Sequence, residues 1–121
     1  MLNKIVTDLE TSKKLKELGI EMETCFEYDK KYLFCSSPAT IISRKSDQYV
    51  KAYTLEQVLE MLPESFKDKW GWDNYWHCES GMIYYVDEHN GPRLYELNAI
   101  KDNLTTAAAK LLIKLKQDKI I

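Results

Sequence analysis

Two stretches of the chain carry the apolar spacing and end signals of amphipathic helices. In "YTLEQVLEMLP", Thr54 and Gln57 have the spacing of a capping box, four apolar residues follow at helical intervals, and Pro63 marks the stop. In "TDLETSKKLKELG", Thr7 or Asp8 can cap the first turn and Gly19 can supply the left-handed residue at the end. These patterns predict helices over about 8–18 and 55–62.

A third helix is predicted near the C-terminus, in "NLTTAAAKLLIKLKQ". Asn103 is the expected cap, and the leucines repeat every three or four residues while the lysines lie on the opposite face. The predicted range is about 103–117.

Alternating aromatic residues in "CFEYDKKYLFC" predict a β-hairpin over 25–35. Taking residues 29–31 as its loop gathers the aromatic residues on one face, and such cross-strand pairs stabilise a sheet. The "SSPATIISRKSD" that follows is interpreted as a turn and a short strand about Ile41 and Ile42. The expected pairs in the hairpin are Tyr28 with Tyr32, Phe26 with Phe34, and Cys25 with Cys35.

A second group of strands is predicted over about 74–98, as a meander of three. Asn90-Gly91 favours a two-residue turn, but Pro92 lacks the N–H that would close it, so a four-residue loop is the preferred alternative. Strands that pair with sequence neighbours, together with about three helices, indicate one α+β domain over 1–121 with a mostly antiparallel sheet. The expected pairs are Glu88 with Arg93, Val86 with Tyr95, Tyr84 with Leu97, His77 with Tyr84, and Tyr75 with Val86.

Charge and composition exclude some classes of function. The net charge is −2, and residues 56–102 carry ten acidic and four basic side chains. An acidic surface repels phosphate, so binding to nucleic acid is not expected. No stretch approaches the ~20 apolar residues of a membrane helix, and the N-terminus has no signal peptide, which predicts a cytoplasmic protein with no membrane contact.

The three cysteines argue for a reducing compartment. Cys25 and Cys35 face each other in the expected hairpin and are predicted to stay reduced. Cys78 lacks a neighbouring base or helix N-terminus that would activate its thiol. Inert thiols are therefore expected.

No metal or cofactor site is predicted. The chain has no metal-ligand spacing of Cys or His, and adjacent His77 and Cys78 point to opposite faces of a strand. No glycine lies in a Gly-rich phosphate loop. The residues available for acid–base chemistry are His77, Glu79, Asp87 and His89.

The segment "WGWDNYWHCES" places Trp70 and Trp72 around Gly71, just before an expected strand. These tryptophans either cap the edge of the core or form exposed anchors for a partner. Trp is enriched at interface hot spots because it offers a large rigid area with a polar handle. If they are anchors, we expect at least one of them to be exposed.

The segments "TDLETSKKLKELG", "YTLEQVLEMLP" and "LTTAAAKLLIKLK", which bracket aromatic strands, resemble a group of small uncharacterised proteins encoded by bacteriophages and by prophages of bacteria. This resemblance implies an intracellular phage-type accessory protein and assigns no catalytic residue.

Two functions remain open from the sequence. The favoured hypothesis is a non-enzymatic protein-binding module, with either a protein partner or self-association, using Trp70 and Trp72. The alternative is a small enzyme with acid–base residues near His77, Glu79, Asp87 and His89. A concave pocket that joins His77 to a carboxylate favours the enzyme.

Overall fold

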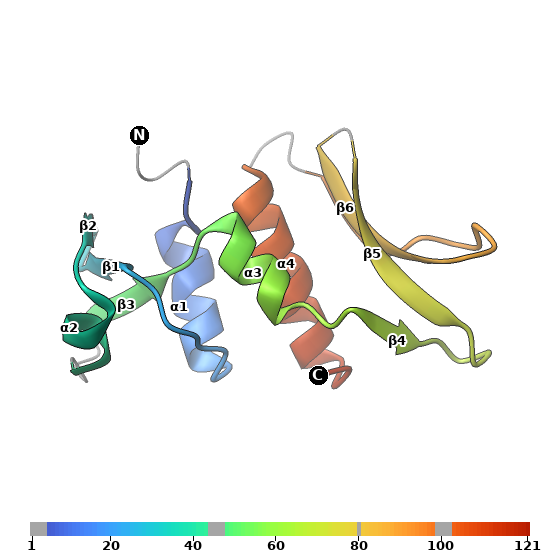
Figure 1. The fold of residues 1–121 in the computed structure, drawn as a ribbon, viewed down its shortest axis with the longest axis horizontal. Coiled ribbons are helices and arrows are strands. Elements are labelled where there is room, and N and C mark those ends of the chain that lie inside the picture. Colours follow the sequence, from blue (N-terminus) through green and yellow to red (C-terminus); the bar gives the residue numbers. More distant parts are fainter. Residues whose placement is uncertain (1–4, 44–47, 80, 99–102) are drawn as a thin grey trace.

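The computed structural model describes residues 5–43, 48–79, 81–98 and 103–121. Within these ranges three helices form the middle of the molecule, with a small sheet at one end and a larger, curled sheet at the other (Figure 1). All strand pairs are antiparallel, so the predicted α+β fold is confirmed. The central helices are α1 (Leu9–Glu17), α3 (Leu55–Met61) and α4 (Leu104–Gln117).

The three central helices begin at the caps that the sequence predicts. The side chain of Asp8 accepts the N–H of Thr11 at 2.8 Å, which settles the first cap in favour of Asp8 over Thr7. The capping box of α3 is complete, with the side chains of Thr54 and Gln57 each accepting the other's backbone N–H. Asn103 caps α4. Each cap satisfies N–H groups that have no partner inside the helix.

The small sheet has the strand order β2-β1-β3, formed by β1 (Phe26–Asp29), β2 (Tyr32–Cys35) and β3 (Tyr49–Ala52). The hairpin exists, but its predicted register is wrong by one residue. Lys30 adopts a left-handed φ of +58°, and the turn closes with two residues where three were expected. A shift of one residue in the register turns every side chain of one strand to the opposite face relative to its partner strand. The aromatic residues of β1 and β2 therefore do not gather on one face. The observed pairs are Phe26 with Cys35, Glu27 with Phe34, Tyr28 with Leu33, and Asp29 with Tyr32.

The segment after this hairpin is helical, so the strand predicted about Ile41 and Ile42 is wrong. The short helix α2 spans Pro38–Ser43. The Ser37 side chain accepts the N–H of Thr40 at 3.3 Å, and proline suits the first position of a helix because its missing N–H is not needed there.

The larger sheet has the order β4-β5-β6-β7 and contains the predicted meander. The predicted register of β5 with β6 is confirmed, with His77 opposite Tyr84 and Tyr75 opposite Val86. A fourth strand, β4, precedes the meander and lies outside its predicted range. The strands are β4 (Ser65–Lys67), β5 (Asp73–Glu79), β6 (Met82–Asp87) and β7 (Leu94–Asn98).

The predicted register of β6 with β7 is wrong. Ile83 lies opposite Leu97 and Tyr85 opposite Leu94, so β7 has one extra residue in a bulge. The loop before β7 spans 88–93, longer than the four residues expected, because the carboxylate of Asp87 accepts backbone N–H groups inside it.

The charge pair predicted between Glu88 and Arg93 is also wrong. The guanidinium of Arg93 lies 3.3 Å from the carboxylate of Glu79 and 3.5 Å from that of Glu96. Glu88 lies beside His89 instead, at 3.9 Å. The longer loop moves Arg93 away from the strand position that the expected register gave it.

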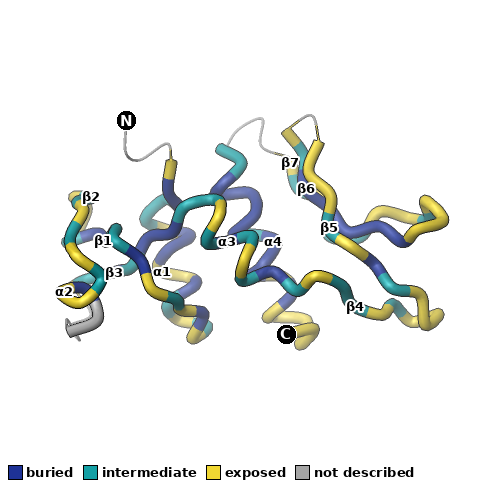
Figure 2. Tube along the Cα trace, in the orientation of Figure 1, coloured by how far each residue is buried: buried dark blue, intermediate teal, exposed yellow. Residues whose placement is uncertain are grey.

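The main core lies between the helices and the inner face of the larger sheet. Leu15 of α1, Val58 of α3 and Leu112 of α4 are fully buried, and Ile83 and Tyr85 of β6 pack into the same cluster. Figure 2 shows buried positions running along α4 and β6. A smaller cluster covers the other sheet and contains Val6, Tyr28, Val50 and Ala52.

Candidate functional site

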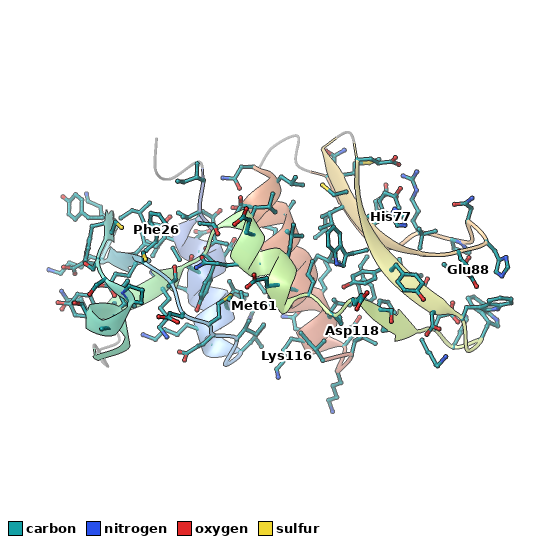
Figure 3. All side chains as sticks on the ribbon, viewed as in Figure 1. Phe26, Met61, His77, Glu88, Lys116 and Asp118 are labelled. Carbon is teal, nitrogen blue, oxygen red and sulfur yellow. The ribbon has the colours of Figure 1, made fainter. Side chains whose placement is uncertain are left out.

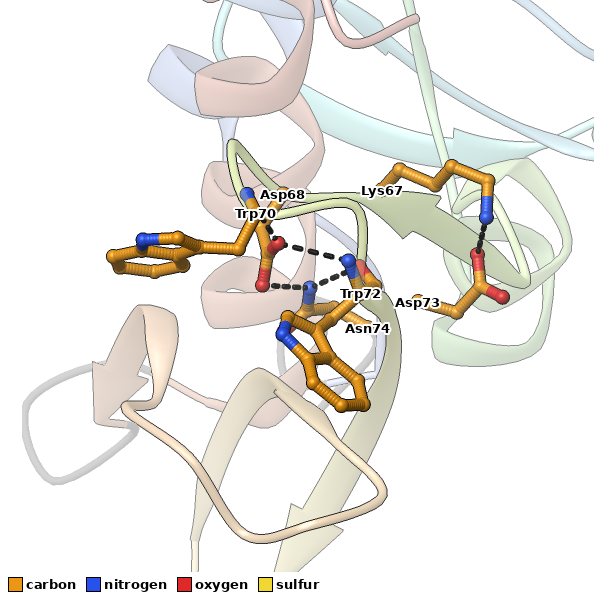
Figure 4. Close-up of polar contacts among 6 residues, drawn as sticks. All are labelled: Lys67, Asp68, Trp70, Trp72, Asp73 and Asn74. Atoms are coloured by element: carbon orange, nitrogen blue, oxygen red, sulfur yellow. Dashed lines mark hydrogen bonds and ion pairs between the residues drawn. The ribbon is translucent and has the colours of Figure 1, made fainter.

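The turn between β4 and β5 is built around the carboxylate of Asp68. One of its oxygens accepts the backbone N–H groups of Trp70 at 2.9 Å and Trp72 at 3.0 Å, and the other accepts the Asn74 amide at 3.1 Å (Figure 4). Gly71 has a φ of +83°, a left-handed conformation that glycine adopts without steric cost. The turn is therefore ordered by its own hydrogen bonds.

The charge of Asp68 is favoured by this arrangement. Partial loss of water alone raises the pKa of the carboxyl, but the hydrogen bonds from Asn74, Trp72 and Trp70 and the nearby Lys69 ammonium bring that pKa below its usual value. At neutral pH the side chain is ionised and accepts all three hydrogen bonds.

Trp70 and Trp72 are both exposed, with 61% and 47% of their surface accessible. The expectation that at least one is exposed is therefore confirmed. The Lys69 ammonium lies 4.5 Å from the ring centre of Trp70, and the Trp72 ring meets His89 edge to face at 4.6 Å. The two indoles extend in different directions from the turn (Figure 4). These contacts hold two large aromatic side chains at the surface.

A pocket of about 490 Å³ lies beside Trp70. Its apolar wall comes from Phe66 of β4, Leu94 and Tyr95 of β7, and Ile120 after α4. The pocket thus combines segments that are far apart in the sequence, with an exposed tryptophan among them. Concave, mostly apolar pockets with a few polar groups are the usual form of a binding site.

Tyr95 is held in a strained position in this pocket. Its φ is +56°, which is rare for a bulky residue, and it lies in the bulge of β7. Its hydroxyl donates to the Asp118 carboxylate at 2.7 Å, and its ring lies 5.9 Å from that of Phe66. Burial, together with Asp118, raises the pKa of Tyr95 to about 12. A strained residue persists only where the surrounding structure holds it, and such residues cluster at binding and active sites.

Two exposed apolar side chains, Trp70 and Ile120, meet at the pocket beside Trp70. We use the name tryptophan surface for Trp70, Trp72 and the pocket beside Trp70. Single exposed apolar residues are normal, whereas a group of them marks an interaction site. Among the described residues, the large exposed apolar side chains on the turn, β5 and the C-terminal segment are Trp70, Trp72, Tyr75, Ile120 and Ile121.

The four acid–base candidates fall into two separate places. The His77 ring stacks on that of Tyr84, with centres 5.9 Å apart. The Glu79 carboxylate accepts the Tyr84 hydroxyl at 2.7 Å, which is the largest cause of a raised pKa at Tyr84. The Arg93 guanidinium also contacts the Tyr84 ring and lies 4.2 Å from its centre. His77 and Glu79 are thus joined through a tyrosine.

Asp87 is the last residue of β6, and His89 lies in the loop that follows. Asp87 is buried and accepts the N–H groups of His89 and Gly91, and the His89 ring contacts Trp72. Figure 3 labels His77 on the hairpin of β5 and β6, and Glu88 in the loop that follows. The tryptophan surface includes none of the four candidates among its pocket residues. Their arrangement gives the enzyme hypothesis little support.

The predicted opposition of Cys25 and Cys35 is wrong, because the register shift pairs Cys35 with Phe26. The carbonyl of Cys25 accepts the N–H of Ser36 at 2.8 Å. All three cysteines carry free thiols in the structure.

In the described part of the chain, no three His, Cys, Asp or Glu side chains come together in a way that could hold a metal ion. A search of the same residues finds no helix with the length and apolar character needed to cross a membrane.

Comparison with protein-family models, with curated proteins and with solved structures found no match. The resemblance to phage-encoded proteins therefore stays a prediction.

The pattern of the sequence did not indicate most of the pocket residues. Phe66 lies between the helix predicted over 55–62 and the predicted meander, and Ile120 follows the last predicted helix. The one local signal was the pair of tryptophans around a glycine. The pocket walls depend on how β4, β7 and the C-terminal segment meet in space.

Proposed function

We propose that the protein is a non-enzymatic interaction module that binds another protein chain through the tryptophan surface. The observation that carries this proposal is the position of Trp70, which is 61% exposed on an ordered turn and lines an apolar pocket. Hot spots in protein interfaces are enriched in tryptophan and cluster near well-packed pockets.

The order of the turn supports the proposal on energetic grounds. Binding costs free energy when loops and side chains must be fixed, and a surface that is already fixed avoids part of this cost. Asp68 holds the backbone on both sides of Gly71, and Lys69 contacts the indole of Trp70. A partner then needs to supply an apolar side chain for the pocket and a flat contact for the indoles.

The test is capture of a partner by tagged protein from host lysate, with Trp70→Ala beside the wild type. Tyr32→Ala is the matched control, because Tyr32 is 66% exposed and lies on the other sheet. Loss of the captured protein with Trp70→Ala and its retention with Tyr32→Ala is the expected result. Equal capture by all three proteins contradicts the proposal.

Sedimentation of the purified protein at several concentrations identifies the case in which the partner is a second copy. If the partner is a second copy, we expect the wild type to self-associate. Trp70→Ala should weaken this self-association, and Tyr32→Ala should leave it unchanged. Self-association that is insensitive to Trp70→Ala contradicts this use of the surface.

A further inference from the structure

A second pocket lies between α1 and the small sheet, away from the tryptophan surface. Its volume is about 610 Å³. Leu9 of α1 and Val50 of β3 give it apolar walls. Tyr32 also lines the pocket, and its side chain is the most exposed of the large apolar and aromatic residues that the structure describes. We call it the lysine pocket, because three of its lining residues are Lys13, Lys30 and Lys31.

The three lysines come from two elements, with Lys13 on α1 and Lys30 and Lys31 in the turn of the hairpin. Some lysines of the described chain have carboxylate partners: Lys14, Lys51 and Lys67 each form an ion pair, the last with Asp73 at 3.3 Å. Within the described residues no ion pair involves any lysine of the pocket. Like charges held together without partners repel each other, and an anion between them removes this repulsion.

The nearby carboxylate of Asp29 does not neutralise the group. It accepts the side-chain amide of Gln48, a residue of the pocket wall, at 2.6 Å. Among the residues that the structure describes, three positive charges thus line the pocket and one carboxylate lies beside its wall. This balance favours a ligand with several negative charges over a single carboxylate.

We propose that the lysine pocket binds a small phosphorylated ligand with a flat ring, of the nucleotide class. Lysine ammonium groups are common phosphate binders in proteins. The Tyr32 ring is 66% exposed, with the Lys31 ammonium 5.5 Å from its centre, and an exposed aromatic face is a platform on which a base stacks. This site is separate from the tryptophan surface and goes beyond the proposed function.

The test is titration with ATP at low ionic strength, followed by amide chemical shifts and by calorimetry. Adenosine and tripolyphosphate are the matched probes for the ring and the phosphates. The expected result is saturable binding of ATP that is tighter than binding of either probe and shifts the amides of Lys13, Lys30 and Tyr32. Added salt weakens this binding, because exposed charges are screened.

Variants locate the site. Each of Lys13→Ala, Lys30→Ala and Lys31→Ala is expected to weaken ATP binding about two- to fivefold, the range of an exposed ion pair. The triple variant should lose about tenfold or more if the effects add. Lys116→Ala, in the last turn of α4, is the control and leaves binding unchanged. Tyr32→Ala weakens binding of ATP but not of tripolyphosphate, and Tyr32→Phe restores it.

Three results overturn the proposal. The first is no saturable binding of ATP by a folded protein, with folding checked by the amide spectrum. The second is ATP binding that the triple lysine variant leaves intact. The third is tripolyphosphate binding as tight as ATP, which shows attraction of charge without a site for the ring. Trp70→Ala has no effect on any of these measurements, so failure here is distinct from failure of the interaction surface.

Discussion

Asp68 and Trp72 hold each other through two hydrogen bonds. The Asp68 carboxylate accepts the backbone N–H of Trp72 at 3.0 Å, and the backbone N–H of Asp68 donates to the Trp72 carbonyl at 2.9 Å. Two hydrogen bonds in opposite directions restrict the backbone of the turn. Trp70, which lies between the two residues, is held by a further hydrogen bond from its backbone N–H to the Asp68 carboxylate.

The first prediction concerns the charge of Asp68. Because its folded pKa lies below the ordinary value of 3.8, the hydrogen bonds to the turn stabilise the fold above the unfolded pKa and are lost as pH falls through the folded pKa. The amide proton shifts of Trp70 and Trp72 should titrate with a midpoint below 3.8. Asp68→Asn should abolish this titration. A midpoint at or above the ordinary value contradicts the arrangement.

The second prediction concerns the stability of tryptophan variants. Trp70 is exposed, so Trp70→Ala should change the free energy of unfolding by about 0.5 kcal/mol or less, as is usual at the surface. Leu112→Ala, in the fully buried face of α4, should cost ~2–5 kcal/mol. Urea unfolding of both variants beside the wild type makes the comparison. A core-sized loss for Trp70→Ala identifies it as a packing residue.

Gly91 gives the third prediction. A methyl group at Gly91 would overlap the carboxylate of Asp87, which accepts the N–H of the same glycine. Gly91→Ala should therefore destabilise the protein by ~1–3 kcal/mol, the usual cost of overpacking. The same change made on an Asp87→Ala background should cost much less, because the obstructing carboxylate is gone. Equal costs on both backgrounds in urea unfolding show that the overlap does not matter.

The fourth prediction is loss of stability at high pH. Burial raises the pKa of Tyr53 and, with Asp118, that of Tyr95 to about 12, whereas an unfolded tyrosine ionises near 10. Stability from these groups is complete below pH 10 and is lost as pH rises toward 12. Unfolding in urea should show a falling free energy across this range, less steep in Tyr95→Phe. The same slope in the variant and the wild type removes Tyr95 from this effect.

Local signals of the sequence predicted the helices well. A cap acts within three residues of its own position, so Asp8, Thr54 and Asn103 are found where short-range chemistry places them. Ser37 and Pro38 carry the same kind of signal for α2, and this local signal outweighs the strand preference of the pair Ile41-Ile42.

Strand registers depended on contacts that the local pattern does not contain. The turn of the first hairpin is shorter because Lys30 takes a left-handed conformation, and β3 covers the other side of β1. At the second hairpin, the Asp87 carboxylate accepts the backbone N–H of His89 in the loop that follows, and Tyr95 lies in the bulge of β7. In the first hairpin the pairing shifts by one residue, which turns side chains to the opposite face. In the second hairpin the shift is one residue at Ile83 and two at Tyr85, on either side of the bulge.

The candidate site was predicted in part. Trp70 and Trp72 are adjacent to a glycine and precede a strand, which placed them on a turn, and the structure exposes both. The walls of the pocket come from Phe66, Leu94 and Ile120, which only the folded chain brings together.

The most direct test of the central claim is the dissociation constant of the captured partner for Trp70→Ala beside the wild type. Truncation of an interface anchor costs ~2 kcal/mol or more, so the variant should bind about 30-fold more weakly. Tyr32→Ala, changed at the opposite end, should bind as the wild type does. A Trp70→Ala constant within about twofold of the wild-type value shows that Trp70 is not the anchor, since twofold is less than a hot spot can contribute.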